Sequence, residues 1–163
     1  MIRDATVADA AAIADLYDYY VHETVITFEL DPVLPKEIAR RIGAVQEASL
    51  PWLVTVEDGE VVGFAYAAPY RPRAAYLHSV EVSIYLRQGV LGRGVGGELY
   101  SGLLARLRNL PVHLALSLIA LPNDASVALH ERLGFTFAGT FTEVGRKFDR
   151  WIDVGHWQLP MGD

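Results

Sequence analysis

The sequence has no cysteine among its 163 residues, and it has few basic side chains: 14 lysines and arginines stand against 20 aspartates and glutamates. Without cysteine there is no disulfide framework, no thiolate nucleophile and no cysteine-ligated zinc, and we predict no metal site. The formal net charge of −6 opposes nucleic-acid binding, because a phosphate backbone attracts a basic face. The composition therefore predicts no nucleic-acid partner.

Long apolar runs and targeting signals are lacking as well. No apolar run approaches the roughly 20 residues that a helix needs to cross a bilayer, and the N-terminus lacks the basic and then apolar layout of a signal peptide. We therefore predict a cytoplasmic protein with no membrane partner. Because 52% of the residues are hydrophobic and no linker or repeat interrupts them, we expect one domain over residues 1–163 with a core of its own.

The first half of the chain carries two helix signals and one hairpin signal. Thr6 can cap a helix, because Asp9 follows it at the capping-box position. Pro35 suits the first turn of a second helix, and Asp58-Gly59 supplies the positive φ angles of a tight hairpin. The expected elements are a strand near residues 1–3, a helix from Thr6 to about His22, a helix from Pro35 with Ile38, Ile42 and Val45 on its apolar face, and strands at residues 52–57 and 61–68.

The second half alternates strand and helix patterns. Residues 75–86 read as a strand, and Gly94–Leu107 reads as a helix, so a glycine cluster lies at a strand-to-helix junction. The elements expected after it are a buried strand over residues 111–120, a helix from Asn123 to Leu133 stopped by Gly134, and strands near residues 135–144 and 151–159.

The glycine cluster is suited to a phosphate group. A helix N-terminus carries about half a positive charge and several unpaired N–H groups, and glycines let a pyrophosphate approach them without a Cβ in the way. The residues that meet this need are Gly92, Gly94, Gly96 and Gly97. Arg87 and Arg93 can add cationic contacts, or they can be solvated arginines beside a loop. A dinucleotide-binding motif is disfavoured, because the spacing departs from G-x-G-x-x-G and no acidic residue follows on a next strand.

This junction resembles the cofactor-binding motif of the GNAT family of acetyl-CoA-dependent N-acetyltransferases, Gln/Arg-x-x-Gly-x-Gly/Ala. Gly94 and Gly96 match its glycines, whereas its polar first position falls on Leu91. The whole chain resembles one branch of that family more closely, the phosphinothricin and methionine sulfone or sulfoximine acetyltransferases. The matching segments are Thr27-Phe28, Pro51-Trp52-Leu53-Val54, Gly63-x-Ala65-Tyr66-Ala67-x-Pro69, Val80-Glu81-x-Ser83-x-Tyr85, Leu121-Pro122-Asn123-Asp124-x-Ser126-Val127-x-Leu129-His130-Glu131 and Trp151-x-Asp153-Val154-Gly155-x-Trp157-Gln158.

The resemblance implies an α/β (α+β) fold of the GNAT type: a central mixed, mostly antiparallel twisted sheet, flanked by helices and splayed at the acetyl-CoA site. It also implies acetyl-CoA as co-substrate, a small-molecule amine as acceptor, and a homodimer. The pantetheine arm would lie between two splayed strands, with the oxyanion held by a backbone N–H near Ser83. The implied cofactor-binding residues are Val82, Ser83, Ile84, Arg87, Gly92, Arg93, Gly94, Val95, Gly96, Gly97, Asn123 and Ser126.

Two residues are candidates for proton transfer. Glu81 lies in a mostly apolar strand, where partial burial would raise its pKa and suit it as a base, although a carboxylate on a solvent-facing rim would read the same way. The resemblance places it at the catalytic glutamate of this branch. His130 stands where many GNAT enzymes have a tyrosine and this branch has histidine, so the resemblance implies an acid for the CoA thiolate or a residue that orients the thiol. The alternative is an ordinary packing or surface histidine, and the segment is no zinc motif, since residue 134 is glycine.

The acceptor site is the least specified part of the sequence. The branch acts on small amino acids with a tetrahedral end group, for which Arg71 and Arg73 can supply charge-assisted bonds. Phe28, Tyr76 and Trp151 can form walls, or they can be core aromatics, just as the arginines can be solvated. Two alternatives stay open: another acceptor, such as a polyamine, an aminoglycoside or a protein N-terminus, and an acyl-CoA sensor without turnover.

Overall fold

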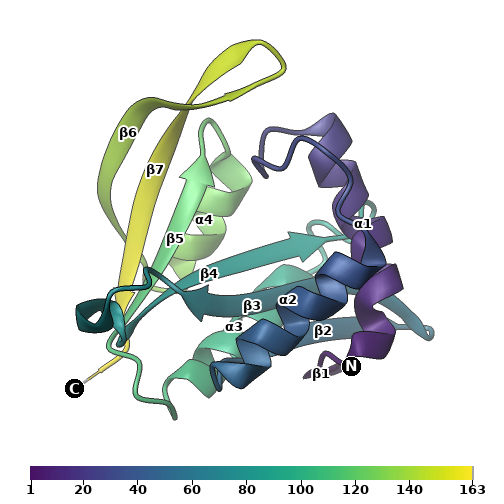
Figure 1. Cartoon of the computed structure of the whole chain (residues 1–163). Helices are drawn as coiled ribbons and strands as arrows, with labels where there is room; N and C mark the ends of the chain where they lie inside the picture. Colours follow the sequence, from purple (N-terminus) through teal and green to yellow (C-terminus); the bar gives the residue numbers. More distant parts are fainter. Residues whose placement is uncertain (163) are drawn as a thin grey trace.

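The computed structural model describes residues 1–162, which form one seven-stranded sheet with four helices (Figure 1). The strands are β1 Ile2–Asp4, β2 Trp52–Glu57, β3 Glu60–Pro69, β4 Ser79–Leu86, β5 Leu114–Ala120, β6 Thr136–Lys147 and β7 Arg150–Pro160. The helices are α1 Ala10–Glu23, α2 Pro35–Glu47, α3 Val95–Leu107 and α4 Asp124–Arg132, with short 3₁₀ turns at η1 Val7–Asp9 and η2 Ala74–Tyr76.

The sheet has the strand order β1-β2-β3-β4-β5-β7-β6, and its pairs are antiparallel except for β4 and β5. The predicted mixed, mostly antiparallel sheet is therefore confirmed. The parallel pair is short: its ladder consists of Ser79–Leu114, Val80–Ala115 and Glu81–Leu116, after which the two strands diverge (Figure 1). This divergence is the splay expected from the resemblance.

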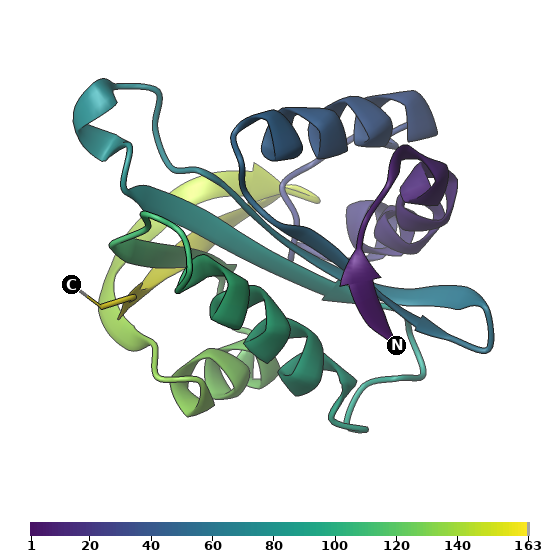
Figure 2. The same cartoon turned by 90° about the horizontal axis from the view of Figure 1, so that it is seen from below.

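The helices cover both faces of the sheet, α1 and α2 on one and α3 and α4 on the other (Figure 2). Two cores result, because each helix buries one apolar stripe against the strands. Leu99, Leu103 and Leu107 of α3 are fully buried as predicted, and so are Ile38 and Ile42 of α2 on the other face. None of the helices within residues 1–162 is both long and apolar enough to span a membrane.

Most local signals specified the elements correctly. Asp58 and Gly59 have φ angles of 50° and 83° at the tip of the β2–β3 hairpin, and Pro35 occupies the first turn of α2. Three elements begin three or more residues later than predicted. The strand expected from residue 111 begins at Leu114, because the chain still turns at residue 111. The strand expected from residue 75 begins at Ser79, because Ala74–Tyr76 closes into a 3₁₀ turn, and the helix expected from Thr6 begins with the 3₁₀ turn η1.

The close packing around Gly155 of β7 predicts that a larger residue at this position lowers stability. A Cβ at Gly155 would lie 2.4 Å from the ring of Trp157, which is buried and donates its indole N–H to Glu131. We therefore expect Gly155→Ala to lower the free energy of unfolding by about 1–3 kcal/mol. Gly43→Ala in α2 is the control: its Cβ meets nothing within 4 Å, so it should gain up to about 1 kcal/mol from helix propensity. Urea denaturation measures both, and equal effects would contradict this account.

Candidate active site

Glu81 lies where the sheet opens. It forms the last pair of the β4–β5 ladder, opposite Leu116, so its side chain stands at the start of the gap between the strands. Burial raises the pKa of this carboxyl above its ordinary value of 4.5, and the neighbouring Arg71 and His156 oppose that rise without cancelling it. Glu81 is thus a half-buried carboxyl and not the fully solvated rim carboxylate that the sequence left open. A carboxyl in this position suits a general base.

The alternation of β4 places hydroxyl groups beside this carboxyl. Residues 81, 83 and 85 share one face of the strand, and Tyr66 of β3 pairs with Ser83 in register. Burial raises the pKa of Tyr66 to about 12 and that of Tyr85 well above 10. Both phenols therefore stay protonated, and they line the same cavity as Glu81.

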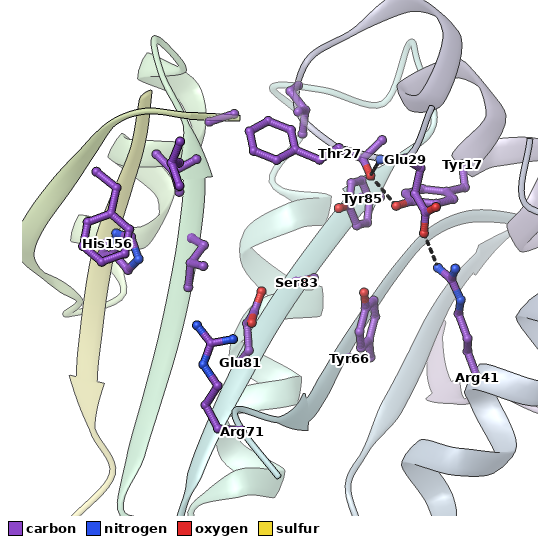
Figure 3. A pocket seen from close by; sticks show the side chains of 17 residues that line it. Tyr17, Thr27, Glu29, Arg41, Tyr66, Arg71, Glu81, Ser83, Tyr85 and His156 are labelled. Atoms are coloured by element: carbon purple, nitrogen blue, oxygen red, sulfur yellow. Dashed lines mark hydrogen bonds and ion pairs between the residues drawn. The ribbon is translucent and has the colours of Figure 1, made fainter. Parts of the chain in front are cut away.

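A cavity of about 560 Å³ opens beside Glu81. Four of the predicted residues line it, namely Phe28, Arg71, Glu81 and Ser83. In Figure 3, Arg71 points up beside Glu81, and His156 approaches from β7 on the far side of β5. The cavity therefore combines a carboxyl, cations and aromatic rings, which is what an amino acid with a nucleophilic amine requires.

Three predicted acceptor residues lie outside this cavity, so the structure does not bring them to Glu81. Arg73 is exposed at the N-cap of η2. Tyr76 packs against Tyr70 with ring centroids 5.5 Å apart. Trp151 is 58% exposed on β7, where a guanidinium, that of Arg146, lies 5.1 Å from its ring centroid.

The glycine junction has the backbone conformation that glycine allows. Gly94 is the N-cap of α3 with φ of 85°, and Gly92 has φ of 80°; both angles lie in the left-handed region. An added Cβ at Gly92, Gly94 or Gly97 would meet nothing within 4 Å, so this backbone is open to a ligand. Gly96 is different: its Cβ would lie 3.0 Å from Leu86, so it serves helix–strand packing. Val95 is the first residue of α3.

The two arginines near this junction have protein partners. Arg87 pairs with Asp15 at 3.1 Å and donates to the carbonyl oxygen of Val61. Arg93 pairs with Glu57 at 3.0 Å. Either guanidinium would have to exchange a surface ion pair, a weak interaction, for a phosphate contact.

Hollows that share lining residues, together called the groove here, extend from the cavity as far as Leu91, just before the glycine junction. One part lies in the splay and is lined by Val82, Ser83, Ile84 and His130, among others. The next part runs between α1 and α4, where Ile84, Leu91 and Asn123 line it. Asn123 caps α4, because its side chain accepts the N–H of Ser126 at 3.2 Å. Asn123 and Ser126 also face the groove, so a capping role and a ligand role are compatible.

His130 is the most enclosed polar residue of the groove, at 2% exposure. Its Nδ1 lies 2.7 Å from the carbonyl oxygen of Ser126, which only accepts, so Nδ1 carries the proton. Its Nε2 lies 2.9 Å from the hydroxyl of Tyr100 and 2.8 Å from that of Ser117, and accepts a hydrogen bond there. Burial lowers the pKa of His130 below 6.5. The ring is therefore neutral and held in one tautomer.

The structure adds residues that the sequence analysis missed. Tyr17, on α1, hydrogen-bonds Thr27 at 2.5 Å, and an ion pair of 2.7 Å joins Glu29 to Arg41; all four side chains line the cavity. His156 lines it too, with a buried Nδ1 that has no hydrogen-bond partner among the described residues. Within residues 1–162 no three His, Asp or Glu side chains converge as a metal site would need.

Comparisons with known proteins identify the family. The family model described as Acetyltransferase (GNAT) domain matches residues 2–156. The chain belongs to the GNAT acetyltransferase family. It is 40% identical to a phosphinothricin N-acetyltransferase of Streptomyces coelicolor, over 98% of this chain and 95% of that protein. It is 36% identical to an L-methionine sulfoximine/L-methionine sulfone acetyltransferase of Pseudomonas paraeruginosa, over 98% of this chain and 94% of that protein.

Solved GNAT structures agree with this assignment. A phosphinothricin acetyltransferase from Sinorhizobium meliloti in complex with acetyl-CoA superposes with a TM-score of 0.96 and 36% identity, covering 99% of this chain and 88% of that one. This GNAT protein is an acetyl-CoA-dependent N-acetyltransferase, and its own residues fit the co-substrate. The open glycine backbone before α3 suits the pyrophosphate, and the groove through the splay suits the pantetheine arm.

Proposed function

We propose that the protein transfers the acetyl group of acetyl-CoA directly to the amine of a small amino-acid acceptor of the phosphinothricin, methionine sulfone or methionine sulfoximine type. The observation that carries this proposal is the cavity in which Arg71 and Glu81 lie side by side (Figure 3). A guanidinium can bind the acceptor's carboxylate while the carboxyl receives a proton from its ammonium group. The names of the relatives support the same acceptor class.

In this proposal Glu81 is the general base. It takes one proton from the ammonium, directly or through a water, and the free amine attacks the thioester carbonyl. A C–N bond forms, the C–S bond breaks, and the departing thiolate takes up the second proton that the attacking nitrogen loses, to become CoA. Backbone N–H groups near Ser83 stabilise the oxyanion, since the β5 ladder ends at Glu81 and leaves that edge of β4 open.

His130 serves the thiolate side of the reaction. The acid role suggested by the resemblance needs a charged imidazolium, which burial disfavours in this protein. We propose instead that the neutral ring orients Ser126, whose carbonyl oxygen accepts a hydrogen bond from Nδ1. Ser126 lines the groove in the first turn of α4, and in this way it positions the thiol of CoA.

The remaining expectations stay proposals. We propose a cytoplasmic location and no nucleic-acid partner, in keeping with the cysteine-free sequence and the net charge of −6. We also propose a homodimer, because one hairpin, β6–β7, exposes several large apolar side chains: Phe137, Phe141, Val144, Phe148 and Trp151. Light scattering after gel filtration tests this state, and a monomer at micromolar concentration would refute it.

The acetyl transfer is tested with a thiol reagent that detects released CoA. Purified protein with acetyl-CoA should release CoA when methionine sulfone, methionine sulfoximine or phosphinothricin is added. A panel with a polyamine, an aminoglycoside and a peptide N-terminus separates this acceptor class from other amines. Tight acetyl-CoA binding without CoA release from any amine would instead indicate a sensor, an alternative raised by the exposed Leu91 in the groove.

A further inference from the structure

One ion pair in the acceptor cavity is not used by the proposed chemistry. Glu29, in the loop after α1, and Arg41 of α2 face each other at 2.7 Å, and both line the cavity. In Figure 3 they stand on the opposite side from Arg71, with Tyr66 between. Arg71 beside Glu81 is the natural partner for the acceptor's carboxylate, so the Glu29–Arg41 pair faces the far end of the acceptor.

The loop that carries Glu29 is held in place by buried contacts. The backbone N–H of Glu29 donates to the hydroxyl of Thr27, which also bonds Tyr17. The ammonium of Lys147, a residue only 3% exposed, donates to the carbonyl oxygen of Thr27 at 2.9 Å. The carboxylate of Glu29 therefore has a fixed place in the cavity wall.

The charges of the cavity are unevenly compensated. Among residues 1–162, Arg71 has no carboxylate within ion-pair distance, whereas Arg41 is bound by Glu29 and, at 2.9 Å, by Glu37. Lys147 lies behind the loop and does not line the cavity. Arg71 is therefore the guanidinium of the cavity that has no ion-pair partner among the described residues, and it suits the single carboxylate of an amino acid. A second anion at the far end would meet the carboxylate of Glu29.

We propose that Glu29 sets the charge that the acceptor carries at its far end: its carboxylate, held beside Arg41 in the cavity wall, makes the site select an uncharged polar end group over an anionic one. This inference rests on the proposed function and narrows it. Methionine sulfone and sulfoximine end in uncharged tetrahedral sulfur groups, whereas phosphinothricin ends in an anionic phosphinate of similar shape. The neutral end groups still have oxygen atoms that Arg41 and the tyrosine hydroxyls can bind.

The test compares binding, so that it does not depend on turnover. Methionine sulfone and phosphinothricin are titrated calorimetrically into the protein saturated with CoA. The parent protein should bind methionine sulfone about tenfold or more tightly than phosphinothricin, and Glu29→Gln should shift this ratio toward phosphinothricin by about tenfold or more, the scale of one unit charge nearby in a partly buried site. Parallel titration with CoA alone should give the same affinity for both proteins.

Glu37→Gln is the matched control, because Glu37 also binds Arg41 but does not line the cavity. It should leave the ratio within about threefold of the parent. An equal shift in both variants, an unchanged ratio in Glu29→Gln, or a parent that prefers phosphinothricin would overturn the inference while the acetyltransferase proposal stands. If neither ligand binds or is acetylated, the proposed acceptor class is refuted, and the inference about Glu29 is refuted with it.

Discussion

Glu81→Gln is expected to lower kcat by about 10²-fold or more, the usual scale for loss of a general base. The amide keeps the size of the side chain but cannot accept the ammonium proton. The rate of the parent should fall on the acid side as Glu81 becomes protonated, at a pH above its ordinary pKa of 4.5, because burial raises that pKa. Steady-state kinetics across pH should show that this acid limb is lost in the variant.

The same substitution should leave the fold intact, which separates catalysis from stability. The raised pKa means that the folded protein binds the Glu81 proton more tightly than the unfolded chain does. The resulting stabilisation is complete below about pH 4.5 and is lost as the pH rises through the raised pKa. At neutral pH an ionised, half-buried Glu81 therefore opposes folding, and Glu81→Gln should unfold at a temperature no lower than the parent.

Glu47→Gln provides the comparison, since Glu47 is exposed at the end of α2 and should leave kcat and its pH dependence unchanged. High pH should partly restore the rate of Glu81→Gln, because the acceptor amine then loses its proton without a base. A variant that retains more than about a tenth of the parental kcat at pH 7 would move the base to another residue.

The parts of this fold that the sequence predicts are those set by local chemistry. Asp58-Gly59 forms a hairpin because those two residues tolerate positive φ angles, whatever lies around them. Gly94 likewise adopts φ of 85° at the start of α3, so the phosphate-suited junction is readable from spacing alone. The apolar strand around Glu81 left a base and a carboxylate on a solvent-facing rim both open, and only the resemblance to the family favoured the base.

The far wall of the acceptor cavity could not be predicted in this way. Tyr17, Tyr66 and Arg41 come from α1, β3 and α2, and each lies in a pattern that is typical of ordinary packing or surface residues. They converge only because the sheet brings β3 and β4 together under the α1–α2 layer (Figure 2). Such long-range placement leaves no signal in a single sequence.

Arginine and aromatic side chains in loops and on strands were ambiguous for a related reason. Arg71 and Arg73 are two residues apart, yet only Arg71 lines the cavity with Glu81. Arg73 is the N-cap of η2, where the backbone turns and the side chain lies outside the cavity. Trp151 lies on a strand near the site, but its ring packs under Arg146 on the outside of the hairpin. The residue types alone identified these side chains as candidates for the acceptor site. The path of the backbone determines which of them line the cavity.

His130→Ala is the second substitution with a large expected effect, a loss of about 10²-fold in kcat, the scale of a misplaced reacting group. The Michaelis constant for acetyl-CoA should change less than kcat, because the pyrophosphate site at Gly94 is untouched. Tyr100→Phe is the milder companion, since it removes one hydrogen bond to Nε2 and keeps the packing. Its loss should be smaller, and a Michaelis constant that rises more than kcat falls would make His130 a binding residue.

The pH profile of the parent decides how His130 acts. An imidazolium acid would lose its proton as the pH rises through a pKa that burial holds below 6.5, so the rate would decline toward neutral pH. A neutral ring that orients Ser126 predicts no such decline between about pH 6.5 and 9.

Because the folded protein binds the His130 proton less tightly than the unfolded chain, stability should also fall as the pH drops below about 6.5. His130→Asn, whose amide nitrogen takes the place of Nδ1 and can donate to the Ser126 carbonyl, should abolish that fall and retain more activity than His130→Ala. Equal inactivity of the two variants would favour direct proton transfer by the ring.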